Sequence, residues 1–152
     1  MTPEEIRQHI FYSSWASKKL IDAAAALSEE QRNQDFGVSH KSLTGTLEHI
    51  HFADRVWLAR IADPRVLDLG WAEVRKRWEN WASAVSHQDI VKNIDYTDLK
   101  GNLHRTPAWQ IVLHVVDHAT LHRGQAISIL RQLGVTPPQT GLIGYYREIK
   151  VK

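Results

Sequence analysis

Apolar residues recur every three to four positions along four stretches of this chain, which is the spacing of one face of an amphipathic helix. The first stretch opens at Thr2-Pro3, a capping residue followed by proline at the first helical position, and runs to Leu27. The second begins between Ser39 and Ser42, and Asp63-Pro64 ends it. The pattern therefore predicts two long helices in the first half of the chain.

The third stretch is a row of tryptophan and valine residues at helical spacing, which indicates a core or a subunit interface: Trp71, Val74, Trp78, Trp81 and Val85. The fourth opens at Thr106-Pro107, again a cap and a proline, and ends at Gly134. Between them, residues 94–103 are typical of a short hairpin before the last helix. Four amphipathic helices in one domain, residues 1–152, predict an all-α four-helix bundle.

Two histidines interrupt the apolar stripe of the fourth helix. His118 and His122 fall among its apolar residues, which are Ile111, Val115, Ala126, Ile129 and Leu133. Four residues apart, the two rings are neighbours, with Cβ atoms about 5–6 Å apart. A single core histidine is usually satisfied by a hydrogen-bond partner, whereas a buried pair at this spacing also suits one metal ion. The pair is therefore a candidate metal site.

The second helix offers candidates for a third ligand, because catalytic metal sites commonly use three protein ligands. His49 and His51 lie on either side of the stripe, and periodicity does not choose between them. Asp54 lies close to the stripe and is an alternative ligand, an acceptor for a ligand histidine, or a buried partner of Arg123. The other histidines follow no pattern and are expected to be exposed: His9, His40, His87 and His104.

Composition narrows the function classes. The absence of cysteine excludes disulfides, thiolate ligands and a cysteine nucleophile, and it favours a cytoplasmic location. The net charge is +2, and the densest basic run, Arg75-Lys76-Arg77, fits a solvated helix face, so we expect no nucleic-acid partner. No apolar run is long enough to span a membrane, and no signal-peptide core is visible at the N-terminus. We therefore expect a soluble protein with no membrane partner.

Several segments resemble the DinB family. Residues 43–50 (LTGTLEHI) and 53–60 (ADRVWLAR) are similar to its second helix. Residues 118–125 (HATLHRGQ), followed by 130–134 (LRQLG), resemble its last bundle helix, and residues 11–16 resemble its opening helix. The resemblance covers nearly the whole chain.

The resemblance implies a four-helix bundle of up-down-down-up topology, commonly a homodimer. It also implies a divalent metal ion, nickel or zinc, bound by His49, His118 and His122, whereas His51 falls where the family usually has an apolar residue. One departure concerns the tail, where members often have Thr-Asp and this chain has Thr140-Gly141. Because Gly141 has no carboxylate, this chain lacks the acidic side chain that would cap a helix or act in the site at this position.

The resemblance further implies an enzyme, because relatives use low-molecular-weight thiols. We expect a metal-dependent transferase or isomerase that uses such a thiol on a small electrophile, with the ion lowering the pKa of the thiol. One alternative is a metal-dependent hydrolase, with Asp54 or Glu48 as base. Another is a non-enzymatic metal-binding or stress-response dimeric bundle. An open coordination position would favour an enzyme, and a closed protein shell a structural role.

Five further residues are candidates for roles beside the ion. Arg123 is expected to pair with Asp54 or with a carboxylate of the thiol or substrate, a structural salt bridge being favoured. Gln125 is expected to orient a ligand, to cap a carbonyl, or to lie at the surface. The aromatic residues could wall a pocket, but core packing is the favoured interpretation for each: Trp15, Trp57 and Tyr145.

Overall fold

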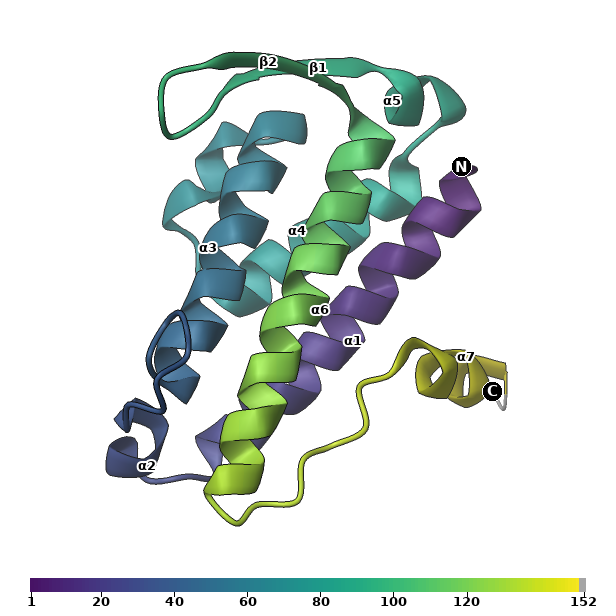
Figure 1. The fold of residues 1–152 in the computed structure, drawn as a ribbon. Helices are drawn as coiled ribbons and strands as arrows, with labels where there is room; N and C mark the ends of the chain where they lie inside the picture. The colour runs from purple at the N-terminus through teal and green to yellow at the C-terminus, as the bar shows by residue number, and fades with distance from the viewer. Residues whose placement is uncertain (151–152) are drawn as a thin grey trace. The chain divides into compact units, whose positions relative to one another are not determined.

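The computed structural model describes residues 1–150, and most of them are helical (Figure 1). The long helices are α1 (Pro3–Ala25), α3 (Leu43–Ile61), α4 (Trp71–Ala84) and α6 (Ala108–Gln132). They correspond to the four stretches predicted from apolar spacing. Within residues 1–150, no helix combines the length and the apolar character that crossing a membrane requires.

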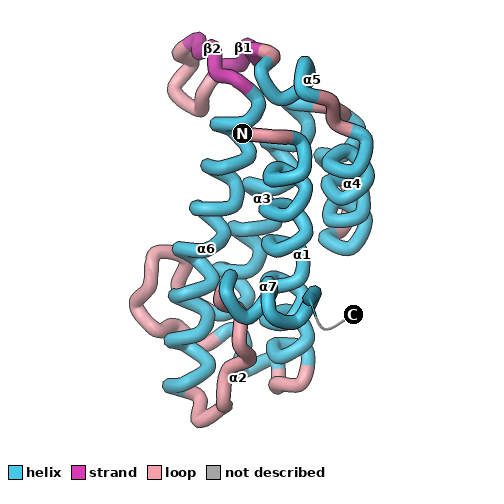
Figure 2. Tube along the Cα trace, turned by 90° about the vertical axis from the view of Figure 1, so that its right-hand side faces the viewer, coloured by secondary structure: helices cyan, strands magenta, loops and turns pink. Residues whose placement is uncertain are grey.

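Shorter elements connect the long helices or follow the last of them, as Figure 2 shows by its colouring of helices, strands and loops. Four of them are helical: α2 (Glu29–Asn33), the 3-10 helix η1 (Pro64–Asp68), α5 (His87–Val91) and α7 (Leu142–Lys150). The predicted hairpin is also present, as antiparallel strands β1 (Asn93–Thr97) and β2 (Leu103–Pro107).

The ends of the long helices follow the capping signals in most places. Thr2 and Glu5 cap α1 reciprocally, since the Thr2 N–H donates to the Glu5 carboxylate at 2.8 Å and the Glu5 N–H donates to Thr2 Oγ1 at 3.2 Å. Gly134 follows α6 with a φ of 76°, a left-handed conformation that glycine adopts without strain. The predicted start of the first long helix and the predicted end of the last one are therefore close to the observed ones.

The start of α6 differs from the prediction. Thr106 and Pro107 are the last residues of β2, where Thr106 pairs with Ile94 of β1, and α6 begins only at Ala108. The Ala108 N–H then donates to the Lys92 carbonyl at 2.9 Å. Threonine followed by proline suits the last residues of a strand as well as a helix start, because proline closes a ladder there at no cost in hydrogen bonds. The Thr106-Pro107 pair therefore does mark a boundary between elements, but it is the end of a strand that runs directly into the helix.

The chain divides into two compact units, and α1, α3 and α6 each contribute residues to both. The first unit consists of Met1–Phe11 and Phe52–Asp117, and includes α4 and the hairpin. Within it, the indole N–H of Trp78 on α4 donates to the Asp54 carbonyl of α3 at 3.0 Å. Its interior is apolar and includes Ile6, Leu58, Val74, Trp78, Ile90 and Ile111.

The second unit consists of Tyr12–His51 and the chain from His118 onward. Its core is a cluster of aliphatic residues from α1, α3 and α6: Leu20, Ala24, Leu43, Ala126, Ile129 and Leu130. The helix α7 packs on α1 in this unit, with the Tyr145 ring 5.5 Å from that of Trp15. The Tyr12 hydroxyl also donates to the Thr140 carbonyl at 3.0 Å. This unit carries all the histidines of the candidate site.

Candidate metal centre

The histidine pair of α6 lies on a buried helix face, as predicted. His122 is only 7% exposed and His118 is half-buried, and their ring centroids are 4.5 Å apart. Ala119 and Ala126 on the same face are fully buried. One helical turn between the two histidines therefore places their rings side by side in the interior of the second unit.

The helix α3 adds His49 to this pair. Its ring centroid lies 4.8 Å from that of His118 and 4.6 Å from that of His122, so each of the three rings contacts the other two. The Nε2 atoms of His49 and His118 are 2.9 Å apart. His51 follows two residues later, and residues at this spacing do not face the same side of a helix. Between the two candidates of α3, the structure thus brings His49 to the α6 pair.

Gln125 supports the centre from the next turn of α6. Its Oε1 lies 2.8 Å from Nδ1 of His122, so the amide oxygen accepts when that nitrogen carries the proton. This tautomer leaves Nε2 of His122 with its lone pair available to a metal ion. The other end of the amide donates to Ser39 Oγ at 3.3 Å. Gln125 therefore orients a histidine and also contacts the loop before α3.

That loop brings a fourth ring, which the sequence did not indicate. His40 stacks on His49 with 3.7 Å between centroids and meets the edge of His122 at 5.3 Å. Ring nitrogens of His40, His49 and His122 all lie within 4.8 Å of one another, an arrangement that could hold a metal ion. Helical periodicity finds ligands on helices only, and a histidine in an irregular loop gives no such signal.

The expectation that four histidines are exposed was therefore only partly correct. His87 and His104 are exposed, whereas His9 and His40 are half-buried. His104 also accepts or donates a hydrogen bond with the Asp98 carboxylate at 2.9 Å in the hairpin. Of these four residues, only His40 lies in the candidate centre.

The surroundings favour neutral imidazoles in the centre. Burial lowers the pKa of His49, and the nearby His40 and His122 lower it further. The pKa of His40 is likewise lowered, by burial first and then by His122. Neutral imidazole is the form that ligates a metal ion. At neutral pH these side chains are therefore ready to act as ligands.

Arg123 is more deeply buried than its position on the helical wheel indicates. The helical wheel places it beyond the apolar stripe, yet the residue is only 2% exposed. Its guanidinium donates to Ser13 Oγ at 3.1 Å, to Ser17 Oγ at 3.2 Å and to Thr120 Oγ1 at 2.8 Å. The Tyr12 ring lies 5.2 Å from the guanidinium carbon. Hydroxyl groups of α1 and α6 thus accept hydrogen bonds from the buried guanidinium. A helical wheel does not predict this burial, because it does not show which other helices surround the residue.

The remaining candidates are less directly connected with the histidines. The ring of Trp15 packs with those of Tyr12 and Tyr145, so two of the proposed pocket aromatics belong to one cluster in the second unit. Trp57 belongs to the first unit, where it packs against Tyr96. Glu48 is exposed. The pairing of Asp54 with Arg123 and a role for Asp54 as ligand or base stay predictions.

Gly141, where the family often has an aspartate, lies directly before the first residue of α7. The Gly141 carbonyl accepts from the Tyr145 N–H at 3.1 Å, which places Gly141 at the start of α7. Thr140 is buried, and its carbonyl receives the Tyr12 hydroxyl. Backbone carbonyls of Thr140 and Gly141 therefore make the hydrogen bonds to α1 and α7 at this position, and no acidic side chain takes part.

The donor set suits a borderline divalent cation. Imidazole nitrogens are ligands for zinc, nickel, copper and iron, whereas magnesium and calcium prefer oxygen. The rings that converge here come from α3, α6 and the loop between α2 and α3. A neutral ligand set of this kind leaves the full positive charge of the ion available to a bound molecule.

Comparison with known proteins gives consistent results. The family model described as DinB family matches residues 2–149. The chain is 22% identical over 148 residues to Protein DinB of Bacillus subtilis (strain 168), an alignment that covers 85% of this chain and 86% of that protein. The crystal structure of a DinB-like protein from Bacillus cereus superposes with a TM-score of 0.64 at 20% identity, over 91% of this chain and 97% of the other. This structural likeness confirms the predicted all-α, DinB-like helical bundle fold.

Proposed function

We propose that this chain, which belongs to the DinB family, binds one divalent metal ion through His49, His118 and His122 and transfers a low-molecular-weight thiol to a small electrophile. The observation that carries the proposal is the convergence of the three rings, with 4.5–4.8 Å between centroids. In particular, the Nε2 atoms of His49 and His118 point at one another across 2.9 Å.

In this proposal the histidines hold the ion, and Gln125 and Arg123 keep the ligand-bearing part of α6 in position. When bound to neutral imidazoles, nickel or zinc supplies a Lewis acid that lowers the pKa of a thiol or a water. Gln125 holds His122 in one tautomer through Nδ1. Arg123 donates to the hydroxyls of Ser17 on α1 and Thr120 on α6, and so keeps the adjacent turn of α6 in place. In the transfer itself, the thiol loses its proton to solvent, sulfur bonds to the electrophilic carbon, and the leaving group departs with the bonding electron pair.

Metal content of untagged protein tests the first half of the proposal. We expect about one nickel or zinc ion per chain after reconstitution, the stoichiometry of a single site with three protein ligands. His118→Ala and His122→Ala should abolish tight binding, and His49→Ala should weaken it severely. His87→Ala is the matched control, because His87 is exposed and lies outside the centre. Loss of binding in His51→Ala but not in His49→Ala would overturn the ligand set.

A thiol screen tests the second half. Metal-loaded protein is incubated with bacillithiol, mycothiol, glutathione or coenzyme A and a model electrophile such as 1-chloro-2,4-dinitrobenzene, and thiol consumption is followed. We expect turnover with one of the thiols, and its loss in His118→Ala. Turnover of esters or amides without thiol would instead identify a hydrolase. Bound metal without either activity would identify a non-enzymatic bundle.

A further inference from the structure

The loop that carries His40 is held in place by its own backbone and by the core. The Phe36 N–H donates to the Lys41 carbonyl at 2.8 Å, and the Lys41 N–H donates to the Val38 carbonyl at 2.9 Å. Lys41 adopts a φ of 68°, which a non-glycine residue takes only where the surrounding structure requires it. Phe36 and Val38 pack against the aliphatic core of the second unit. The backbone at His40 is therefore fixed.

The helix α3 is shaped to receive this loop. A Cβ atom on Gly45 would lie 2.2 Å from the His40 carbonyl oxygen, closer than real atoms approach. Only glycine at this position therefore lets the backbone of His40 lie against the first turn of α3. The Ser42 side chain caps the same turn, accepting from the Gly45 N–H at 3.0 Å.

The ring of His40 lies against two of the three histidines on the long helices, His49 and His122. It stacks on His49 at an interplanar angle of 17° and contributes a ring nitrogen within 4.8 Å of those of His49 and His122. Ligand nitrogens on one tetrahedral ion lie about 3.4 Å apart, since each bond is about 2.0–2.1 Å. Gln125 connects the two sides, with its oxygen on His122 and its nitrogen on Ser39 beside His40.

We propose that His40 is a fourth protein ligand of the ion, delivered by the loop of residues 36–42. This inference rests on the proposed function for the presence of the ion, but not on the reaction. It changes the site from three imidazoles on two helices to four imidazoles, one of them on a loop. Four imidazole ligands would fill a four-coordinate site, so a thiol would have to displace one of them, such as His40, to reach the ion.

Cobalt-substituted protein reports the number of nitrogen ligands directly. Co²⁺ is added to untagged wild-type protein and to His40→Phe, and the visible absorption, the X-ray absorption fine structure and the affinity against a competing chelator are recorded. Phenylalanine keeps an aromatic ring against His49 but has no ligand atom. We expect four nitrogen ligands in the wild type, three in His40→Phe with a changed visible spectrum, and an affinity at least about tenfold lower, since even outer partners of a metal site are typically worth 10–100-fold.

Three further outcomes decide the proposal. Gly45→Ala keeps every histidine but displaces the loop, so it should also lower the cobalt affinity, with the helical circular dichroism unchanged. An unchanged spectrum and affinity in His40→Phe would show that His40 only packs on His49, and would overturn the inference while leaving the three-histidine site intact. Absence of cobalt from the wild type would overturn the proposed metal site and this inference together, whereas failure of the thiol assay alone would leave the fourth ligand standing.

Discussion

Gln125 shows how one residue can fix the chemistry of another without touching a metal ion. Its amide oxygen lies 2.8 Å from Nδ1 of His122, and its nitrogen donates to Ser39. We expect Gln125→Leu to lower the metal affinity about 10–100-fold, as the loss of such hydrogen-bonded partners typically does. Gln125→Glu keeps an acceptor for Nδ1 and should retain most of the affinity. Equal losses in both variants, measured by chelator competition, would contradict an orienting role.

Arg123 is the largest fully buried side chain of the described residues, and its charge is met by hydroxyls. We expect Arg123→Ala to lower the free energy of unfolding by about 2–5 kcal/mol, because it leaves a cavity and strands the hydroxyls of α1 without their donor. Urea denaturation of metal-free protein measures the effect. Arg131→Ala, on an exposed position of the same helix, is the control and should change stability by less than about 0.5 kcal/mol.

At the scale of single residues, the sequence predicted those site residues that interrupt a repeating apolar pattern on a helix. His118 and His122 stood out because they interrupt an apolar stripe, and the structure buries that stripe. The choice of His49 over His51 came from the family resemblance, since both lie equally far from the stripe of α3. His40 was missed because its position depends on a loop conformation and on the missing side chain of Gly45, and neither produces a repeat in the sequence.

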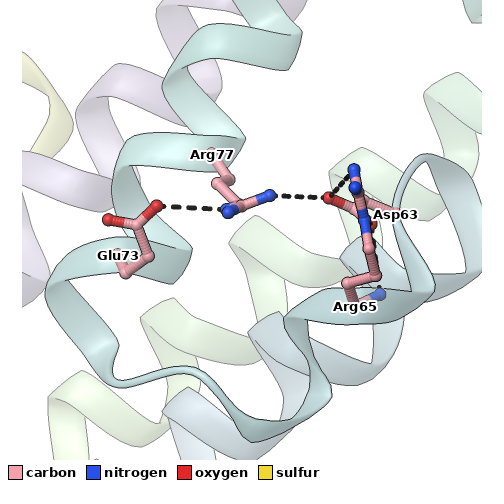
Figure 3. Close-up of polar contacts among 4 residues, drawn as sticks. All are labelled: Asp63, Arg65, Glu73 and Arg77. Atoms are coloured by element: carbon pink, nitrogen blue, oxygen red, sulfur yellow. Dashed lines mark hydrogen bonds and ion pairs between the residues drawn. The ribbon is translucent and has the colours of Figure 1, made fainter.

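At the scale of elements, η1 and α4 are joined by a network of charges (Figure 3). Arg77 of α4 donates to the carboxylate of Glu73 at 3.1 Å and to that of Asp63 at 2.7 Å. Asp63 caps η1, and Arg65 also donates to it at 2.8 Å. The hydrogen bonds from Arg65, and then the positive charges of Arg65 and Arg77, lower the pKa of Asp63 to about 2.

The network makes stability depend on pH in a defined window. Because the pKa of Asp63 is lower in the folded chain than in the unfolded one, its contribution is complete above about pH 4 and is lost as the pH falls through about 2. We expect Asp63→Asn to be less stable than wild type at pH 5, and the difference to shrink towards pH 2 in urea denaturation. The same substitution at Asp68, exposed at the end of η1, is the control. A difference that is constant from pH 5 to pH 2 would contradict this assignment.

The long elements were predictable because apolar spacing repeats over several turns, and errors in single residues average out. The short helices α2, α5 and α7 were not predicted, since five to nine residues give too few repeats to define a face. The Thr106-Pro107 signal was assigned to the wrong element because the partner strand β1 decides it, and pairing between strands is not a local property.

At the scale of the whole molecule, the candidate centre belongs to one compact unit, and the hairpin and Trp57 belong to the other. The sequence did not indicate this division, because α1, α3 and α6 continue through it without a break in their patterns. A metal ion on residues of α3 and α6 would stabilise the folded chain by mass action, since the unfolded chain does not hold the ligands together.

We therefore expect zinc or nickel to raise the melting temperature. At a free concentration 100 times the dissociation constant, the stabilisation is about 2.7 kcal/mol, or about 5–10 °C for a chain of this size. Scanning calorimetry with and without a chelator measures it, and His118→Ala should show no shift. An equal shift in His118→Ala would place the stabilising ion elsewhere on the protein.

The contact between His49 and His118 joins residues that are 69 positions apart. On a ribosome that adds about 5–20 residues per second, His118 is added about 3–14 s after His49. Throughout that interval the nascent chain has His40 and His49 but neither of the α6 imidazoles. If the proposed ligand set is correct, an ion bound during this interval would have only two of its four ligands, His40 and His49, and would exchange readily. The full ligand set is therefore available only after both α6 histidines have been added and α6 has packed against α3.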